Sequence, residues 1–188
     1  MTDPLDGSAP SPGSADAVEA SSARKLARVR LRWFLLACAV AAGAVLIDQG
    51  SKALALAELS EDDLIPLLGD WLGLQLAFNP GTVMSLGSDS TWLLTLIAAA
   101  ASIALLIAAT RAPSAGWAVA IGLVWGGAVG NLLDRLLAPP GFGRGHVTDF
   151  LAYGNLFIGN LADVILGVGV ALGLLLYLRG PHHTRNEQ

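Results

Sequence analysis

The sequence predicts an all-α membrane protein with four transmembrane helices and a small extracytoplasmic β element between helices 1 and 2. Hydrophobic residues make up 54% of its 188 residues and charged residues 14%, whereas an average soluble domain has about 25% charged residues. A first apolar stretch covers residues 33–47. Three later stretches cover residues 92–109, 117–133 and 161–178, and each is close to the ~20 residues that a helix needs to cross the hydrocarbon core.

The N-terminal segment has a different composition from the rest of the chain. Residues 1–22 are rich in Ser, Ala, Pro, Gly and Asp and have no apolar period, so we expect a disordered cytoplasmic tail. A membrane domain over residues 23–179 and a second cytoplasmic tail over residues 180–188 complete the predicted organisation. The basic run from Arg24 to Arg32 resembles the start of a signal peptide. Because three more apolar stretches follow, we expect the first one to be retained as a span.

Positive charges predict the orientation of the chain in the membrane. Basic residues crowd before the first span, Arg111 lies between the second and third, and Arg179 and Arg185 follow the fourth. The positive-inside rule then places both termini in the cytoplasm. The net charge is −4, and the Lys and Arg residues form no stripe, which argues against nucleic acid as a partner.

Two glycine pairs predict how the helices pack. Gly126 and Gly130, and likewise Gly169 and Gly173, are four residues apart, a spacing that lets helix backbones approach closely. We therefore expect spans three and four to touch through these glycines. Between spans one and two, residues 65–78 alternate imperfectly between apolar and small or polar residues, which predicts a few short strands that rest on the membrane surface.

Polar residues are concentrated at the span ends that face the outer side of the membrane. An ionisable side chain inside a span costs at least ~2.5 kcal/mol at the bilayer centre and usually faces the bundle interior. Residues three apart on a helix share one face. We therefore expect a single polar pocket. Its members are Asp48, Gln49 and Lys52 after span one, Asn79 and Ser85 before span two, Asn131, Asp134 and Arg135 in span three, and Asp149, Asn160 and Asp163 around the start of span four.

Several of these residues also have a purely structural interpretation. Asp48 and Lys52 are an i, i+4 pair, which neutralises the end of a helix without any further role. Asp134 and Arg135 are equally typical of an interfacial ion pair that orients the third span. The Asn-Pro-Gly sequence of residues 79–81 is typical of a turn.

The remaining carboxylates, Asp149 and Asp163, have no adjacent basic residue. We interpret the segment around Asp149, including His146, as a loop near the lipid headgroups, and Asp163 as the first turn of span four. Two carboxylates in a poorly solvated pocket cannot both ionise cheaply, so the pair shares a proton near neutral pH. An aspartic protease works in this state: the ionised carboxylate takes a proton from the attacking water, and the protonated one donates to the scissile carbonyl.

Five sequence blocks resemble, in order, those of signal peptidase II, the lipoprotein signal peptidase family of bacteria. The resemblance covers residues 30–178. One such block is weak evidence, whereas five in order on a four-span pattern are specific. The blocks are residues 48–52 (DQGSK), 79–85 (NPGTVMS), 126–135 (GGAVGNLLDR), 146–150 (HVTDF) and 160–163 (NLAD).

The resemblance implies a role for each matching residue. Asp149 and Asp163 occupy the positions of the catalytic dyad. The implied substrate is a prolipoprotein whose cysteine carries diacylglycerol; it is cut just before that cysteine while the lipid stays in the membrane, and the implied inhibitor is the cyclic peptide globomycin. We expect no cofactor, and no His, Cys or carboxylate cluster has metal-ligand spacing. Positions that bind substrate or support the site are matched by Asp48, Lys52, Asn79, Gly81, Asn131, Asp134, Arg135, Asn160 and Ala162.

The chain departs from the family pattern at a few positions. Residues 82–84 replace Ala-Ala-Phe, Thr148 replaces Val, and Gly159 replaces Phe. The interval of 14 residues from Asp149 to Asp163 is shorter than usual. These departures leave open a non-catalytic scaffold that binds lipoprotein or lipid. A small transporter is a weaker alternative, because it needs polar residues through the whole membrane depth and the cytoplasmic halves of the spans are almost bare of them.

Overall fold

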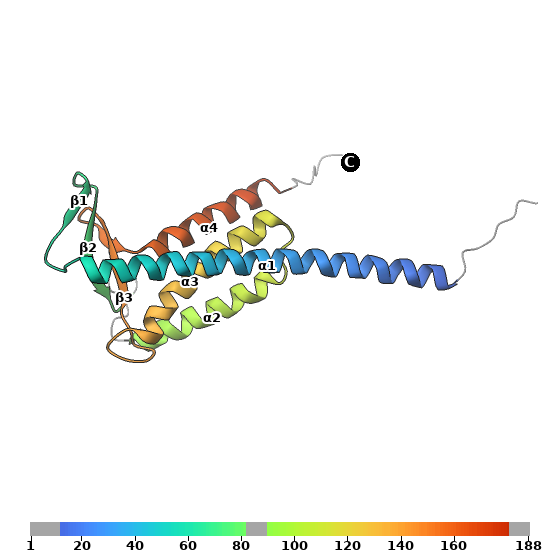
Figure 1. Ribbon diagram of the computed structural model, residues 1–188, viewed down its shortest axis with the longest axis horizontal. Coiled ribbons are helices and arrows are strands. Elements are labelled where there is room, and N and C mark those ends of the chain that lie inside the picture. The colour runs from blue at the N-terminus through green and yellow to red at the C-terminus, as the bar shows by residue number, and fades with distance from the viewer. Residues whose placement is uncertain (1–11, 82–89, 181–188) are drawn as a thin grey trace, which may run out of the picture.

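The computed structural model describes residues 12–81 and 90–180 and contains four long helices. Each is long and apolar enough to cross a membrane, which confirms the expected number of spans. Figure 1 shows the helices side by side, with a sheet at one end of the bundle; the start of α1 and the end of α4 lie at the other end. The helices are α1 (Pro12–Glu58), α2 (Thr91–Ala109), α3 (Ala115–Leu137) and α4 (Leu161–Leu178).

The first helix begins earlier than the sequence predicts. Its backbone is helical from Pro12, so residues 12–22 differ from the disordered tail that we expected there. Proline is favoured in the first turn of a helix, and the alanines after it have high helix propensity. The composition of residues 1–22 as a whole does not reveal this local preference. The stretch suited to spanning begins at Arg24, close to the predicted domain boundary. The other domain boundaries remain predictions.

Helix α3 is the centre of the bundle, because it packs against α1, α2 and α4. A Cβ added at Gly126 would lie 2.5 Å from the Cβ of Ala44 in α1. A Cβ added at the next residue, Gly127, would lie 2.6 Å from the carbonyl oxygen of Ala162 in α4. Gly126 therefore allows the contact with α1, and its neighbour Gly127 allows the contact with α4.

The predicted glycine contact between spans three and four is only half right. Gly169 does press against α3, where an added Cβ would lie 2.8 Å from the backbone nitrogen of Val124. Gly126 and Gly130, however, face Ala44 and Asp48 of α1. A spacing of four residues identifies one face of a helix, but it does not say which neighbour covers that face.

The sheet combines two segments that are far apart in the sequence. All its pairs are antiparallel, in the order β1-β2-β3-β4. The strands expected within residues 65–78 are confirmed, but the segment that we interpreted as a loop around Asp149 forms the other two strands. Pairing with β2 satisfies the backbone polar groups of this segment, and such pairing cannot be read from local sequence. The strands are β1 (Ile65–Leu68), β2 (Leu72–Asn79), β3 (Val147–Tyr153) and β4 (Phe157–Gly159).

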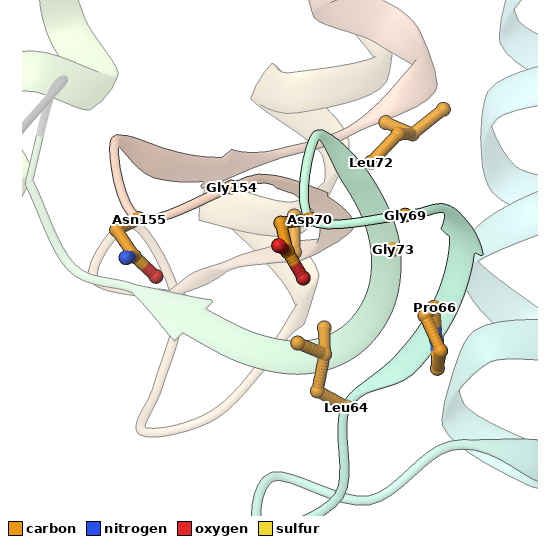
Figure 2. Close-up of a pocket in the computed structure, with 9 residues that line it drawn as sticks. Leu64, Pro66, Gly69, Asp70, Leu72, Gly73, Gly154 and Asn155 are labelled. Atoms are coloured by element: carbon orange, nitrogen blue, oxygen red, sulfur yellow. The ribbon is translucent and has the colours of Figure 1, made fainter.

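The far end of the sheet carries apolar side chains outside the helical bundle. Trp71 is 83% exposed and Leu68 is 66% exposed at the β1–β2 turn. A cavity of about 380 Å³ lies between this turn and the β3–β4 turn, with Asp70 and Asn155 beside it (Figure 2). None of the residues that line this cavity is a candidate site residue. Contact of this element with the membrane surface remains a prediction, which the exposed side chains support.

The close approach of α1 and α3 can be tested with two glycines that differ only in their surroundings. We expect Gly126→Ala to destabilise the protein by about 1–3 kcal/mol, because the added methyl overpacks the contact with Ala44. Gly43→Ala is the control: it lies in α1 with nothing within 4 Å of the added Cβ. It should be neutral or slightly stabilising, since Ala favours a helix. Unfolding midpoints in detergent measure both, and equal midpoints would contradict the packing argument.

Candidate active site

The predicted polar pocket is present at the end of the bundle that carries the sheet. Its residues come from α1, α3, α4, β2 and β3, and most of their polar atoms are removed from solvent. Asp48 is 0% exposed, Asn160 1%, and Lys52 and Asp149 3% each. Burying polar groups to this extent is costly unless each is hydrogen-bonded or ion-paired, so the partners of each group define the site.

Lys52 of α1 is the single cation between two buried carboxylates in this part of the pocket. Its Nζ lies 2.9 Å from Asp48 Oδ2 and 2.8 Å from Asp134 Oδ2. Its third bond goes to Asn131 Oδ1, at 3.0 Å. An ammonium group has three donors, and all three are used here. The i, i+4 pair with Asp48 is confirmed, but Lys52 also ties α1 to α3.

Asp134 pairs with Lys52 rather than with its neighbour Arg135, so the alternative of an Asp134–Arg135 ion pair is wrong. Adjacent residues of a helix point in different directions, which separates these two side chains. Asp134 Oδ1 also accepts a bond from Gln49 Nε2, at 3.1 Å, and Oδ2 accepts one from the backbone N–H of Thr148, at 3.0 Å. Asp134 thereby fixes the start of β3 against α3.

Asp48 anchors the N-terminus of α4. Its Oδ1 accepts a hydrogen bond from the backbone N–H of Ala162, at 3.1 Å. The first backbone N–H groups of a helix have no partner within the helix and favour a nearby negative charge. The Asp48 carboxylate supplies both a hydrogen-bond acceptor and a negative charge at this position. Gly130 makes room for it, because a Cβ at that position would collide with the Asp48 carboxylate.

The side-chain amide of Asn131 has only one favourable orientation. Its oxygen faces Lys52, which can only donate, so its Nδ2 must point the other way. There it donates to Asp163 Oδ1, at 2.9 Å. The buried cation therefore determines, through one amide, that Asp163 receives a hydrogen bond. As predicted, Asn131 and Asp134 share a face of α3, since both contact Lys52.

Asp163 and Asn160 form a capping box at the start of α4. The Asn160 side chain accepts from the backbone N–H of Asp163, at 3.0 Å, and Asp163 Oδ2 accepts from the backbone N–H of Asn160, at 3.3 Å. Since the oxygen of the Asn160 amide is occupied, its Nδ2 must turn outward. It donates to Asp149 Oδ1, at 2.7 Å. One asparagine thus links the two candidate catalytic carboxylates.

Asp149 lies in β3, and its second oxygen accepts a hydrogen bond from β2. Asn79 Nδ2 donates to Asp149 Oδ2, at 3.2 Å, while the backbone N–H of Gly81 donates to Asn79 Oδ1, at 3.0 Å. The register explains the contact: Asn79 is opposite Val147, two residues before Asp149 on the same face. The turn role expected for residues 79–81 and a role in the site therefore coexist.

The environment of Asp149 favours its neutral form. Burial raises the pKa of Asp149 to about 6, and the negative charge of Asp163 adds to this effect. Hydrogen bonds from Asn160 and Asn79 act in the opposite direction, because they stabilise the ionised carboxylate, and so does the charge of Lys52. Desolvation is the largest of these effects, so the pKa of Asp149 is raised overall.

Arg135 reaches the site from the other side of α3. Its Nη2 donates to the carbonyl oxygen of Gly81, at 2.5 Å. The side chain is 8% exposed, and within residues 12–81 and 90–180 its Nη1 has no hydrogen-bond partner. A buried donor without a partner costs about 1–3 kcal/mol. Nη1 is therefore an unsatisfied buried donor among the described residues.

The structure adds two features that the sequence reasoning missed. The backbone N–H of Thr148 contacts Asp134, and the side chain of Tyr153 lies on the Asp149 face of β3. Burial raises the pKa of Tyr153, and the negative charge of Asp163 adds a smaller contribution. Tyr153 and Asp163 are therefore near each other. The alternating sequence VTDFLAY was the available signal, since period-two alternation in a strand puts Asp149 and Tyr153 on one face.

Other predicted positions lie away from the site or cannot be described. His146 precedes β3 and helps line an apolar cavity of about 600 Å³ together with Phe78 and Pro139. Ser85 and the substituted residues 82–84 lie outside the described residues. In the part of the chain that the structure describes, no group of three or more His, Cys, Asp or Glu side chains could hold a metal ion.

Four membrane-length helices and two amide-linked carboxylates, of which Asp149 is buried, are features that suit an aspartic protease working in the membrane. The family model for signal peptidase (SPase) II matches residues 40–179 of the chain. The chain therefore belongs to the signal peptidase II family and is an aspartic-type membrane protease.

Individual relatives agree with this membership, and solved structures share the fold. The chain is 43% identical to the lipoprotein signal peptidase of Leifsonia xyli subsp. xyli, over 92% of this chain and 79% of the relative. It is 43% identical to the Bifidobacterium longum enzyme, over 82% and 84%. A bacterial membrane enzyme solved by the in meso method has a TM-score of 0.69 at 24% identity, over 81% of this chain and 93% of that one. A second has a TM-score of 0.66 at 25% identity, over 77% and 94%.

The buried charges can be tested through Lys52. We expect Lys52→Met to destabilise the protein by about 3–5 kcal/mol, because Asp48 and Asp134 would remain buried without their cation. Adding Asp134→Asn to that variant should recover part of the loss, since it removes one uncompensated charge. Unfolding midpoints of the wild type, single and double variants measure the effect. A double variant less stable than Lys52→Met alone would contradict the charge argument.

Proposed function

We propose that Asp149 and Asp163 are the dyad with which this protein cuts signal peptides from diacylglyceryl-modified prolipoproteins, just before the lipid-modified cysteine. The observation that carries the proposal is the link through Asn160, whose side chain donates to Asp149 while its backbone donates to Asp163. The two carboxylates are linked by one residue and supplied with donors from fixed directions; Asp149 is buried, whereas Asp163 is exposed at the edge of the site.

The arrangement favours one division of labour between the carboxylates. Asp163 receives hydrogen bonds from Asn131 and from the backbone of Asn160, lies in the first turn of a helix, and is exposed, so it is placed to meet the attacking water. It takes the proton from the attacking water. Asp149, whose pKa burial raises to about 6, holds the shared proton and donates it to the scissile carbonyl oxygen. The pair exchanges these states as the amide bond breaks.

A membrane-anchored substrate fits the position of the dyad. The carboxylates lie where the helices meet the sheet, so a peptide reaches them from the sheet side while its acyl chains remain among the helices. Arg135 supports this assignment, because its buried Nη1 has no partner among the described residues and would gain one from a peptide carbonyl. Globomycin, a cyclic peptide, would compete for the same place.

The orientation that fits this substrate puts the sheet and the dyad near the outer face of the bacterial cytoplasmic membrane. The start of α1 and the end of α4 share the opposite end of the bundle (Figure 1). Basic residues precede the first span there, and the positive-inside rule favours a cytoplasmic location for that end. Both termini are then cytoplasmic.

Cleavage of a purified diacylglyceryl-modified precursor tests the dyad. We expect Asp149→Asn and Asp163→Asn each to lower kcat by about a thousandfold or more, because each removes one partner in proton transfer. Asp70→Asn, at the β1–β2 turn, is the matched control and should leave cleavage unchanged. Globomycin should inhibit the wild type. A wild type that binds the precursor without cutting it would support the scaffold alternative and overturn the proposal.

The pH dependence of kcat/KM tests which carboxylate holds the proton. Burial raises the pKa of Asp149 to about 6, so Asp149 loses its proton as pH rises through that value. We therefore expect kcat/KM to fall as pH rises through about 6. Asn79→Ala removes a donor that favours ionised Asp149, and should move this fall to higher pH by about one pH unit.

Gln75→Ala is the control for the pH experiment. It removes another amide of β2, one that donates to the carbonyl oxygen of Glu61 and not to the dyad. We expect the pH profile of this variant to match that of the wild type. A profile that moves to lower pH in Asn79→Ala, or that does not move at all, would contradict the assignment of the proton to Asp149.

A further inference from the structure

Two buried hydroxyl groups of α2 bond to loops beside the site. Figure 1 shows the start of α2 at the sheet end of the bundle. Thr91 is the first residue of α2, and its Oγ1 donates to the carbonyl oxygen of Pro80, at 2.9 Å. Thr95 lies one turn later, with its Oγ1 2.8 Å from the carbonyl oxygen of Gly143. The pocket described above draws its side chains from the other helices and the sheet, so these contacts connect α2 to the site.

Thr91 holds the peptide group whose other end orients Asn79. The Pro80 carbonyl and the Gly81 N–H belong to one planar peptide unit, so an anchor on the carbonyl also restricts the direction of the N–H. That N–H donates to Asn79 Oδ1, at 3.0 Å, and Asn79 Nδ2 donates to Asp149 Oδ2, at 3.2 Å. Three hydrogen bonds in series therefore connect the Thr91 hydroxyl with Asp149.

This peptide group needs an anchor because the backbone on either side of it can rotate. Pro80 has a fixed φ but a free ψ, and Gly81 tolerates almost any φ. Arg135 Nη2 holds the carbonyl oxygen of Gly81, which belongs to the next peptide unit. Opposite rotations about Pro80 ψ and Gly81 φ would turn the first unit without moving the second. The contact with Thr91 therefore restrains a rotation that Arg135 leaves possible.

The direction of the Asn79 amide decides which form of Asp149 it stabilises. The Gly81 N–H can only donate, so it holds Oδ1 and leaves Nδ2 as the donor toward Asp149. A donor favours the ionised carboxylate, whereas Oδ1 in that place would favour the protonated one. The other groups that face Asp149 stay in place when this amide alone turns; they are Asp163 of α4, Lys52 of α1, Arg135 of α3 and, on the same face of β3, Tyr153.

We propose that Thr91 is a positioning residue for the dyad, which holds the Pro80–Gly81 peptide group so that the Asn79 amide donates to Asp149. Its effect on cleavage rests on the proposed function, whereas its effect on the ionisation of Asp149 follows from the hydrogen bonds alone. Thr95 has no part in this series among the described residues, because its hydroxyl contacts the carbonyl oxygens of Thr91 and Gly143.

Two readouts test Thr91: the pH dependence of kcat/KM, and the titration of Asp149 followed by ¹³C NMR of labelled aspartate carboxyl groups, assigned with Asp149→Asn. Thr91→Val removes the donor and keeps the shape of the side chain. We expect both midpoints to move to higher pH, by up to about one pH unit, because ionised Asp149 loses support. In an Asn79→Ala background, Thr91→Val should add no further shift, since the series is already broken.

The matched control is Thr95→Val, the same substitution at a buried position one turn along α2. It should leave both midpoints at their wild-type values even where it lowers stability, and Thr91→Ser, which keeps the hydroxyl, should do the same. Thr91→Ala removes the same donor and serves if Thr91→Val does not fold.

Three outcomes would overturn the role of Thr91. They are midpoints that do not move in Thr91→Val, an equal shift in Thr95→Val, and a full additional shift in the Asn79→Ala background. Retained cleavage in Asp149→Asn would instead overturn the proposed function, and the NMR titration would still decide whether Thr91 positions the amide.

Discussion

The rest of the site depends on the burial of one ammonium group between two carboxylates. Lys52 is 3% exposed and holds Asp48, Asp134 and Asn131 within 3.0 Å of its Nζ. This trio of charged residues carries one net negative charge, and backbone amides of Ala162 and Thr148 complete its coordination. The same contacts fix the start of α4 and the start of β3, the two elements that carry the proposed dyad. The positions of Asp149 and Asp163 therefore depend on this charge cluster.

Such a cluster is possible only where helices come unusually close. Gly126 and Gly127 allow α1 and α4 to approach α3 from different sides, and Gly130 leaves room for the Asp48 carboxylate. In lipid, apolar side chains gain little by leaving their surroundings, so small residues and polar contacts hold helices together. Both kinds of contact occur here. The glycines let the helix backbones approach, and the buried charges then pair across the short distance between the helices.

The sequence predicted the spans, the pocket and its members because these depend on local rules. Polar residues in apolar stretches are conspicuous, and i, i+3 or i, i+4 spacing places Asn131 beside Asp134 and Asp48 beside Lys52. What it failed to predict depends on pairing between distant segments. Strand β3, the register that brings Asn79 to Asp149, and the division of glycines between α1 and α4 all need a partner whose identity is not encoded locally. The catalytic roles themselves remain proposals.

The capping box of α4 gives the two aspartates opposite relations to the stability of the fold. Asp163 accepts from the Asn160 backbone at a helix N-terminus, so its negative charge stabilises the helix on which it is placed. Burial of Asp149 outweighs the nearby charge of Lys52 and raises its pKa, so the ionised form of Asp149 works against folding. Under the proposed roles, the conflict between activity and stability therefore falls on Asp149. Neutralising Asp149 relieves a cost of folding, whereas neutralising Asp163 removes a support of α4.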